Sequence, residues 1–297
     1  MEINKALFGY CGGKSRLSQQ IIKYMADHKV YIEPFFGSGG IYFCKGFKST
    51  KQNDYIEVIN DLNADIVNFF EQLRDNHQEL IEKLEYYEYS ETLRKKSKTN
   101  CDFYKNSSNI DRACLFFFNI CSSFGGDLNK GFAYGFNNIP LKVINKVKKI
   151  KYYSERIRKS YIFNRTYDVM IDKFDSKDSL FYLDPPYLNT IKYEVQKDKD
   201  NDLDYNKLSE NIKNIKGKFI LSHYKDEWIM DNFNNKDYKI IDLDHYCSIN
   251  KSNGEERVGK DVDECIVLNY DYKDVRIWDG IERDKNFKYK AVNLLDM

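Results

Sequence analysis

The chain has 297 residues, of which 47 are basic and 46 acidic, so its formal net charge at pH 7 is only +1. With this balance, overall charge alone would not attract the protein to nucleic acid. No apolar run is long enough to cross a membrane. With no signal-peptide pattern at the N-terminus, we expect a soluble cytoplasmic protein of one or two domains.

The cysteines and histidines indicate neither a disulfide framework nor a metal site. Seven cysteines are scattered without a Cys-x-x-Cys pair, a pattern that favours reduced thiols. The four histidines lack the spacing typical of metal ligands. We therefore expect no metal cofactor.

The first part of the chain, residues 1–69, reads as alternating strand and helix. Apolar residues at helical spacing follow Gly12-Gly13, and a short strand then leads into a loop rich in glycine. A helix should follow this loop, then a second strand that ends at Asp61, then a further helix. The expected strands are residues 30–32 and 56–60, and the glycine-rich loop is residues 33–40.

Strand patterns are absent from residues 70–158, where apolar residues recur at helical spacing around a glycine-rich loop at 124–135. Strands then resume, in alternation with helical patterns, which predicts a mainly parallel sheet covered on both faces. A polar loop, and no helix, separates the last two strands, so we expect an antiparallel hairpin at the sheet edge. The expected strands are residues 161–163, 180–183, 219–221, 240–243 and 265–268.

These patterns define an α/β fold interrupted by a helical insertion. Residues 1–69 and 159–297 form the expected α/β domain, and residues 70–158 form the insertion. A charged stretch at residues 195–204 is interpreted as a lid over the site.

The tetrapeptide Asp184-Pro185-Pro186-Tyr187 directly follows a short apolar run and uses two of the four prolines in the chain. Adjacent prolines are stiff and lack backbone donors, so their carbonyls remain free to accept. An acid, a carbonyl and an aromatic ring held in fixed relation at a strand end suit a flat substrate that carries an amine. Taken alone, the same tetrapeptide also fits an ordinary turn.

Three further segments favour a nucleotide-like ligand. The loop Gly37-Ser38-Gly39-Gly40 joins a strand to a helix, as phosphate- and nucleotide-cradling loops do, although a tight turn needs the same residues. Asp61 ends the next strand, where an acid holds ribose hydroxyls or caps a helix. Tyr10 to Lys14 forms a loop before the first helix, and an exposed turn is the alternative.

Together these segments resemble the DNA adenine methyltransferases that transfer a methyl group from S-adenosylmethionine. The matching motifs are Tyr10-Cys11-Gly12-Gly13-Lys14, Glu33-Pro34-Phe35-Phe36-Gly37-Ser38-Gly39, Asn60-Asp61-Leu62-Asn63 and Asp184-Pro185-Pro186-Tyr187, in the family's order. The resemblance implies a Rossmann-like methyltransferase sheet, S-adenosylmethionine as cofactor, S-adenosylhomocysteine as product, and N6 of a flipped adenine as the methyl acceptor.

The resemblance also implies roles for individual residues. Asp184, Pro185, Pro186 and Tyr187 are the implied catalytic residues. An acid at the first of these positions favours adenine over cytosine. The implied cofactor-binding residues are Tyr10, Lys14, Glu33, Pro34, Phe35, Gly37, Gly39, Asp61, Asp168 and Asp184. Asp168 alternatively caps a helix.

The insertion carries the expected DNA-binding residues. Residues 142–159 contain eight basic side chains and one acid, a local charge of +7 from eight minus one, and a second cluster lies at 94–98. A solvated helix face gives the same pattern, but a chain that handles DNA makes phosphate contact the better interpretation. The residues assigned to DNA are Arg94, Lys95, Lys96, Lys142, Lys146, Lys148 and Lys149.

The sequence thus predicts a site-specific DNA adenine methyltransferase, monomeric and bacterial or phage-encoded, that acts on double-stranded DNA, with a cognate restriction endonuclease as a further partner. Two alternatives remain at this point: an RNA adenine methyltransferase, and a catalytically silent DNA-binding relative. Relatives that methylate GATC carry an Arg- and Asn-rich recognition loop at the position of residues 122–135, and the loop of this chain does not have that pattern, so the target sequence does not follow.

Overall fold

The structure is a computed structural model that describes residues 5–10, 12–46, 55–128, 130–135, 138–187, 203–244 and 264–278. The expected lid at 195–204 falls outside the described residues except for its last two, and Cys11, His245 and Cys247 also fall outside. Within the described part of the chain, no helix is both long and apolar enough to span a bilayer.

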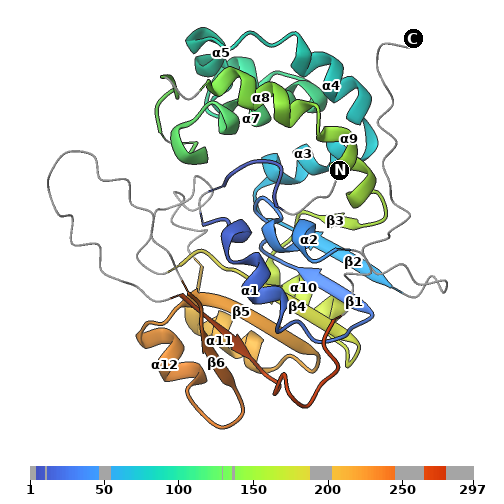
Figure 1. Ribbon diagram of the computed structural model, residues 1–297, viewed down its shortest axis with the longest axis vertical. Helices are drawn as coiled ribbons and strands as arrows, with labels where there is room; N and C mark the ends of the chain where they lie inside the picture. The colour runs from blue at the N-terminus through green and yellow to red at the C-terminus, as the bar shows by residue number, and fades with distance from the viewer. Residues whose placement is uncertain are drawn as a thin grey trace, which may run out of the picture.

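A seven-stranded sheet organises the larger part of the molecule, with strand order β3-β2-β1-β4-β5-β7-β6 (Figure 1). The first five strands in this order, β3-β2-β1-β4-β5, pair in parallel. Strand β7 runs antiparallel to both of its neighbours, β5 and β6. The strands are β1 (Val30–Glu33), β2 (Ile56–Asn60), β3 (Tyr161–Phe163), β4 (Ser179–Leu183), β5 (Lys218–Tyr224), β6 (Lys239–Asp242) and β7 (Glu264–Leu268). The expected α/β fold, mainly parallel with a C-terminal antiparallel hairpin, is confirmed.

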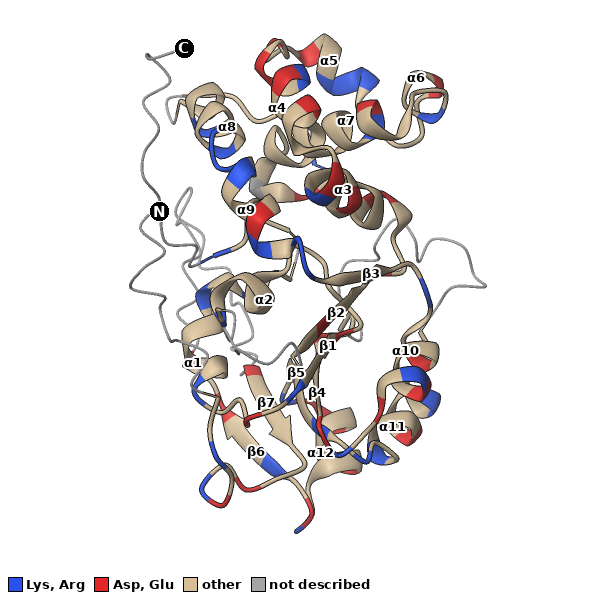
Figure 2. Ribbon diagram, turned by 90° about the vertical axis from the view of Figure 1, so that its right-hand side faces the viewer, with Lys and Arg blue, Asp and Glu red and all other residues tan. Residues whose placement is uncertain are grey.

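Helices cover both faces of this sheet, as Figure 2 shows. On one face lie α1 (Ser18–Ile22) and α2 (Gly40–Cys44), and on the other lie α10 (Tyr167–Phe174), α11 (Tyr205–Lys213) and α12 (Glu227–Phe233). Successive strand residues therefore enter different cores: Tyr182 packs in the first, while Phe181 and Leu183 pack in the second. Because both faces are buried, β4 is apolar almost throughout.

A helical block stands at one end of the sheet, between β2 and β3 in the sequence (Figure 1). In its described residues the only β pairing is the isolated bridge between Ser123 and Phe132. The first helix of the block packs on the fifth and the last helix of the block and also on β3. The block contains α3 (Ala64–Asp75), α4 (His77–Glu85), α5 (Glu91–Lys96), α6 (Asp102–Lys105), α7 (Asn109–Cys121), α8 (Ile139–Val147) and α9 (Ile150–Ile157).

Candidate functional site

Lys14 and Asp184 meet where the strand order reverses, between β1 and β4. Parallel β1 and β4 are neighbours whose crossovers leave in opposite directions, and ligands of open α/β sheets bind at such points. Asp184 directly follows β4, and Lys14 begins the 3-10 helix η1 (Lys14–Arg16). The Lys14 Nζ lies 3.0 Å from Oδ1 of Asp184 and donates to the Gly12 carbonyl at 2.9 Å.

Burial affects the ionisation of Asp184. The two side chains are only 4% and 17% exposed, for Lys14 and Asp184 respectively. Burial raises the pKa of Asp184 above its ordinary value, and the positive charge of Lys14 acts in the opposite direction. The lysine therefore helps to keep a carboxylate ionised in an environment that disfavours charge.

Tyr187 completes this corner with an aromatic face. The Lys14 Nζ lies 4.5 Å from the centre of the Tyr187 ring. The same ring packs against His223 and Tyr224 of β5, with centroids 4.6 and 4.5 Å away. The Pro186 carbonyl accepts a hydrogen bond from the hydroxyl of Tyr205, so the turn is fixed from α11 as well.

Asp61 holds the glycine-rich loop after β1 in place. Its carboxylate accepts from the backbone N–H of Gly37 at 2.7 Å and of Asn63 at 2.8 Å. Burial raises the pKa of Asp61 to about 6, although these hydrogen bonds act to lower it. Gly37 and Gly39 have φ of 52° and 69°, and a Cβ on Gly39 would lie 2.5 Å from the ring of Phe36. The tight loop therefore needs glycine here.

The remaining predicted cofactor residues surround this loop or lie beside it. Asn60 donates to the Pro34 carbonyl at 2.9 Å, while Phe35 stacks on Tyr167 with ring centroids 5.5 Å apart. A Cβ on Gly37 would lie 3.5 Å from the ring of Tyr10. The structure thus brings the Tyr10 loop, the glycine-rich loop and Asp61 together.

Glu33 and Asp168 also have protein partners for their carboxylates. Glu33 is buried and accepts from the Tyr31 hydroxyl at 2.8 Å; burial raises its pKa well above the ordinary value. Asp168 pairs with Lys207 at 2.6 Å, and this hydrogen bond lowers its pKa. Asp168 is not the N-cap of α10, because Thr166 occupies that position and Asp168 lies in the first turn of the helix.

Arg94, expected on a DNA-binding surface, is instead buried. Its Nη2 donates to Ser123 Oγ at 2.8 Å and to the carbonyls of Lys130 and Leu128 at 3.0 and 3.2 Å. A buried guanidinium with these acceptors organises the glycine-rich loop of the helical block, and it is not placed to contact phosphate. The cluster pattern did not distinguish this residue from its exposed neighbours.

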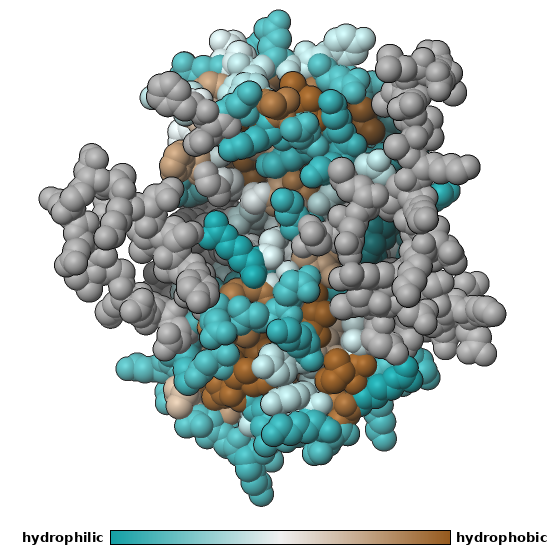
Figure 3. Space-filling model, viewed as in Figure 1, coloured by the Kyte–Doolittle hydropathy of each residue, from teal (hydrophilic) through white to brown (hydrophobic). Residues whose placement is uncertain are grey.

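The other expected DNA-binding lysines lie at or near the surface of the helical block. Lys95 pairs with Glu91 at 3.1 Å, and Lys96 lies over the ring of Phe103. Lys146 is half-buried, and its Nζ lies 3.5 Å from Cys121 Sγ. Lys142 and Lys148 are exposed, and Lys149 is half-buried. Figure 3 shows hydrophilic side chains over much of this block, interrupted by apolar ones.

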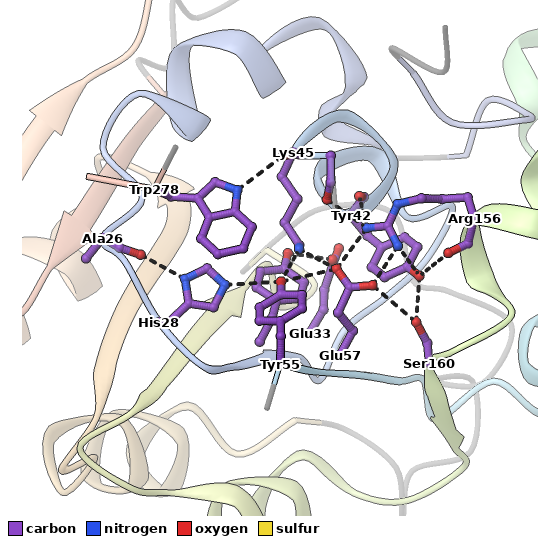
Figure 4. Close-up of polar contacts among 12 residues, drawn as sticks. Ala26, His28, Glu33, Tyr42, Lys45, Tyr55, Glu57, Arg156, Ser160 and Trp278 are labelled. Atoms are coloured by element: carbon purple, nitrogen blue, oxygen red, sulfur yellow. Dashed lines mark hydrogen bonds and ion pairs between the residues drawn. The ribbon is translucent and has the colours of Figure 1, made fainter. Parts of the chain in front are cut away.

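A second buried cluster joins the helical block to the sheet, and the sequence analysis missed it (Figure 4). Glu57 of β2 accepts from Lys45 at 2.5 Å and from Arg156 of α9 at 2.6 Å. Tyr42 contacts the same arginine, and Trp278 donates to the Lys45 carbonyl at 3.2 Å. Arg156 therefore belongs to a buried ion pair, although we counted it in the basic run of residues 142–159.

Two further polar residues, His223 and Glu264, lie beside Tyr187 and were not predicted from the sequence. His223 is fully buried; its Nδ1 donates to the Tyr224 carbonyl at 3.0 Å, and its Nε2 has no partner among the described residues. Glu264 of β7 is buried, and its charge acts on Asp184 and Tyr187. Single polar residues at strand ends carry no motif, so only the register of β5 and β7 reveals them.

Comparison with known proteins adds independent evidence. A family model described as "D12 class N6 adenine-specific DNA methyltransferase" matches residues 10–249. A DNA N-6-adenine-methyltransferase of Escherichia phage P1 is 32% identical over 80 residues, which cover 27% of this chain and 10% of that protein. A DNA adenine methylase of Vibrio cholerae is 23% identical, covering 63% of this chain and 66% of the methylase.

A type II methyltransferase of Methanocaldococcus jannaschii, M.MjaIII, is 26% identical, covering 63% of this chain and 70% of that protein. The chain thus spans a tenth of the phage protein and just under two thirds of the Vibrio methylase.

Proposed function

We propose that this protein methylates the N6 amine of adenine in duplex DNA, since the chain belongs to the family of D12 class N6 adenine-specific DNA methyltransferases. The methyl donor would be S-adenosylmethionine. The observation that carries the proposal is the buried contact of Lys14 with Asp184, next to Pro185 and Tyr187, at the switch point of the sheet.

The crevice beside this contact fits the proposed cofactor. Asp61 offers a half-buried carboxylate that accepts only backbone N–H groups in the described structure, so hydroxyl donors of a ribose can share it. Gly37 has no Cβ, and the ring of Tyr10 lies opposite it. Pro34, Phe35, Gly37 and Asp61 would hold the nucleoside, and Tyr10, Lys14 and Asp184 the amino-acid end. When bound, the cofactor supplies an electrophilic methyl group on a sulfonium.

The corner after β4 would orient the acceptor amine. The lone pair of the adenine amine is delocalised into the ring, which makes it a weak nucleophile. If Asp184 and the Pro185 carbonyl accept its two N–H bonds, the nitrogen becomes pyramidal and its lone pair becomes available. The same acceptors stabilise the positive charge that develops on nitrogen. Lys14 supports this role because it favours the ionised form of Asp184.

The adenine must leave the duplex to reach this corner, and Tyr187 would stack on the extruded ring. We assign residues 1–69 and 159–297 to catalysis and residues 70–158 to target recognition, with Lys142, Lys146, Lys148 and Lys149 near the phosphates. Lys95 and Lys96 have a weaker claim, because Glu91 and Phe103 engage them. Double-stranded DNA is the proposed partner, and a cytoplasmic monomer acting with or without a cognate endonuclease is the proposed context.

Methyl transfer from labelled S-adenosylmethionine tests this function directly. The protein is offered mixed-sequence duplex DNA or structured RNA, and the product is digested to nucleosides. We expect N6-methyldeoxyadenosine from the duplex and no label in RNA. Label in RNA alone would identify an RNA methyltransferase, and cofactor binding without transfer to any DNA would indicate a silent relative.

A further inference from the structure

The chain from Phe8 to Lys14 connects the helical block with the catalytic corner. The buried Phe8 ring lies among four phenylalanine rings of the block, with centroids 5.4 to 6.3 Å away. Those rings belong to Phe69 and Phe70 of α3 and to Phe116 and Phe117 of α7. Six residues later, Lys14 contacts Asp184. One short segment is therefore anchored in the block at one end and reaches the site at the other.

Between these ends, the segment touches the glycine-rich loop of the block, which we call the recognition loop (residues 122–135). Gly126 of this loop has φ of +72°, and a Cβ there would lie 2.5 Å from the Gly9 carbonyl oxygen and 2.9 Å from its carbon. The two backbones are thus in direct contact, and any larger residue must move one of them.

Hydrogen bonds make the recognition loop a single unit. The buried Arg94 donates to Ser123 Oγ and to the Leu128 and Lys130 carbonyls, so it joins both sides of Gly126. The Ala133 N–H donates to the Ser122 carbonyl at 2.7 Å. If DNA displaces any part of this loop, the loop should therefore move as one unit, and Gly126 would shift the Gly9 backbone with it.

The other side of Gly9 leads directly to the proposed cofactor residues. The carbonyl of Tyr10 accepts from the Gly13 N–H at 2.9 Å, and this hydrogen bond closes a turn. The ring of Tyr10 lies against Gly37 of the glycine-rich loop after β1. The Lys14 Nζ donates to the Gly12 carbonyl at 2.9 Å, so the turn also fixes the lysine. A shift at Gly9 would move Tyr10 and Lys14 together.

We infer that Gly126 is a positioning residue: through Gly9, the recognition loop sets Tyr10 and Lys14, and thereby couples DNA binding to cofactor binding. The inference rests on the proposed function, because it takes the Tyr10 to Lys14 turn as part of the cofactor site and the helical block as the part that recognises DNA. Coupling between two sites is reciprocal, so DNA on the loop must change the affinity for cofactor by the same factor that cofactor changes the affinity for DNA.

The test compares Gly126→Ala with Gly131→Ala by calorimetric titration with S-adenosylhomocysteine. Gly131 is a matched control, since it lies in the same loop, its φ is not in the left-handed region, and its Cβ would meet nothing within 4 Å. We expect Gly126→Ala to weaken cofactor binding about fivefold or more, the lower end of usual coupling between sites. Gly131→Ala should stay within about twofold. Equal affinities of the two variants would overturn the inference.

A second measurement does not depend on the folding of either variant. The affinity of the unaltered protein for S-adenosylhomocysteine is measured with and without a saturating duplex, and we expect a difference of about fivefold or more. Identical affinities would overturn the coupling. If the unaltered protein binds no cofactor at all, the proposed function fails. If it transfers methyl groups while both comparisons show no difference, only this inference fails.

Discussion

The Lys14 ammonium group lies 3.0 Å from Oδ1 of Asp184, although the two residues are far apart in the sequence and both are largely buried. The contact joins the N-terminal turn to the end of the central strand β4. It places one cation against a carboxylate whose pKa burial raises.

Replacing Lys14 with methionine should move the acid limb of the pH–activity profile to higher pH. In the proposed mechanism Asp184 would act in its ionised form; burial raises its pKa, and Lys14 opposes that rise. Without the lysine the pKa rises further, so activity is lost at a pH where the unaltered enzyme is still active. Lys29→Met is the control, because Lys29 is an exposed lysine paired with Asp178 at the far end of β1. An unchanged acid limb in Lys14→Met would contradict this role.

The affinity for S-adenosylmethionine should fall as the pH drops through about 6, the pKa of Asp61. Burial raises this pKa, so the carboxylate is ionised only above it, and hydroxyl donors bind the ionised form better. Below pH 6 the affinity should drop by up to about tenfold per pH unit. Calorimetric titration between pH 5 and 8 measures this. Asp61→Asn should bind weakly and without the pH dependence, and equal affinities of the unaltered protein at pH 5 and 8 would argue against Asp61.

Loss of the buried ion pair between Glu57 and Arg156 should destabilise the whole protein. Burial favours the neutral acid, but Arg156 and Lys45 outweigh it and lower the pKa of Glu57 to about 2. Breaking such a pair leaves an uncompensated charge, so Glu57→Gln should cost about 3–5 kcal/mol in the free energy of unfolding. The exposed pair of Glu91 and Lys95 provides the control, and Glu91→Gln should change it by about 0.5 kcal/mol or less.

The effect of Glu57→Gln should also depend on pH in a defined direction. The folded pKa lies below the ordinary value of 4.5, so the stabilisation is complete above pH 4.5 and is lost as the pH falls towards 2. Denaturant unfolding at pH 7 and pH 3 should therefore show a smaller difference between the two proteins at pH 3. A difference that grows on acidification would rule out this ion pair as the cause.

Removal of Lys142 or Lys148 should weaken DNA binding at every sequence and reduce its salt dependence. Both lysines are exposed, on α8 and directly after it. Each lost phosphate contact lowers the slope of log affinity against log salt by about 1. Fluorescence anisotropy at several salt concentrations measures the slope. The exposed Lys236, between α12 and β6, is the control, and a slope unchanged in all three alanine variants would exclude α8 as a phosphate contact.

Much of the fold could be predicted because local pattern and tertiary structure agree. Each expected strand is present, and the strands at residues 56–60 and 161–163 have the predicted bounds. The clearest case is β4, since a buried parallel strand is a nearly continuous apolar run. The loop that contains Gly37 was also predictable, because its left-handed backbone needs glycine. These features depend only on neighbours in the sequence.

Features that depend on distant partners were not predictable in the same way. Arg94 and Arg156 stand in basic clusters and are typical of surface charge, yet Arg94 is buried and the Arg156 side chain is only 9% exposed, because their acceptors come from segments far away in the sequence. A signal did exist for Arg156: Tyr153 and Ile157, at helical spacing, mark the buried face of α9, and the arginine lies at its margin. For His223 and Glu264, only the pairing of β5 with β7 brings them to the corner.

Methyl transfer by Asp184→Ala tests the central claim most directly. The variant and the unaltered protein are each given labelled S-adenosylmethionine and duplex DNA, after calorimetry has confirmed that both bind S-adenosylhomocysteine. Because Asp184 would orient the amine and stabilise the charge that develops on it, we predict a loss of at least about 100-fold in the rate of methyl transfer, as for other preorganised acceptors and donors. A variant that methylates adenine at the unaltered rate would contradict the account.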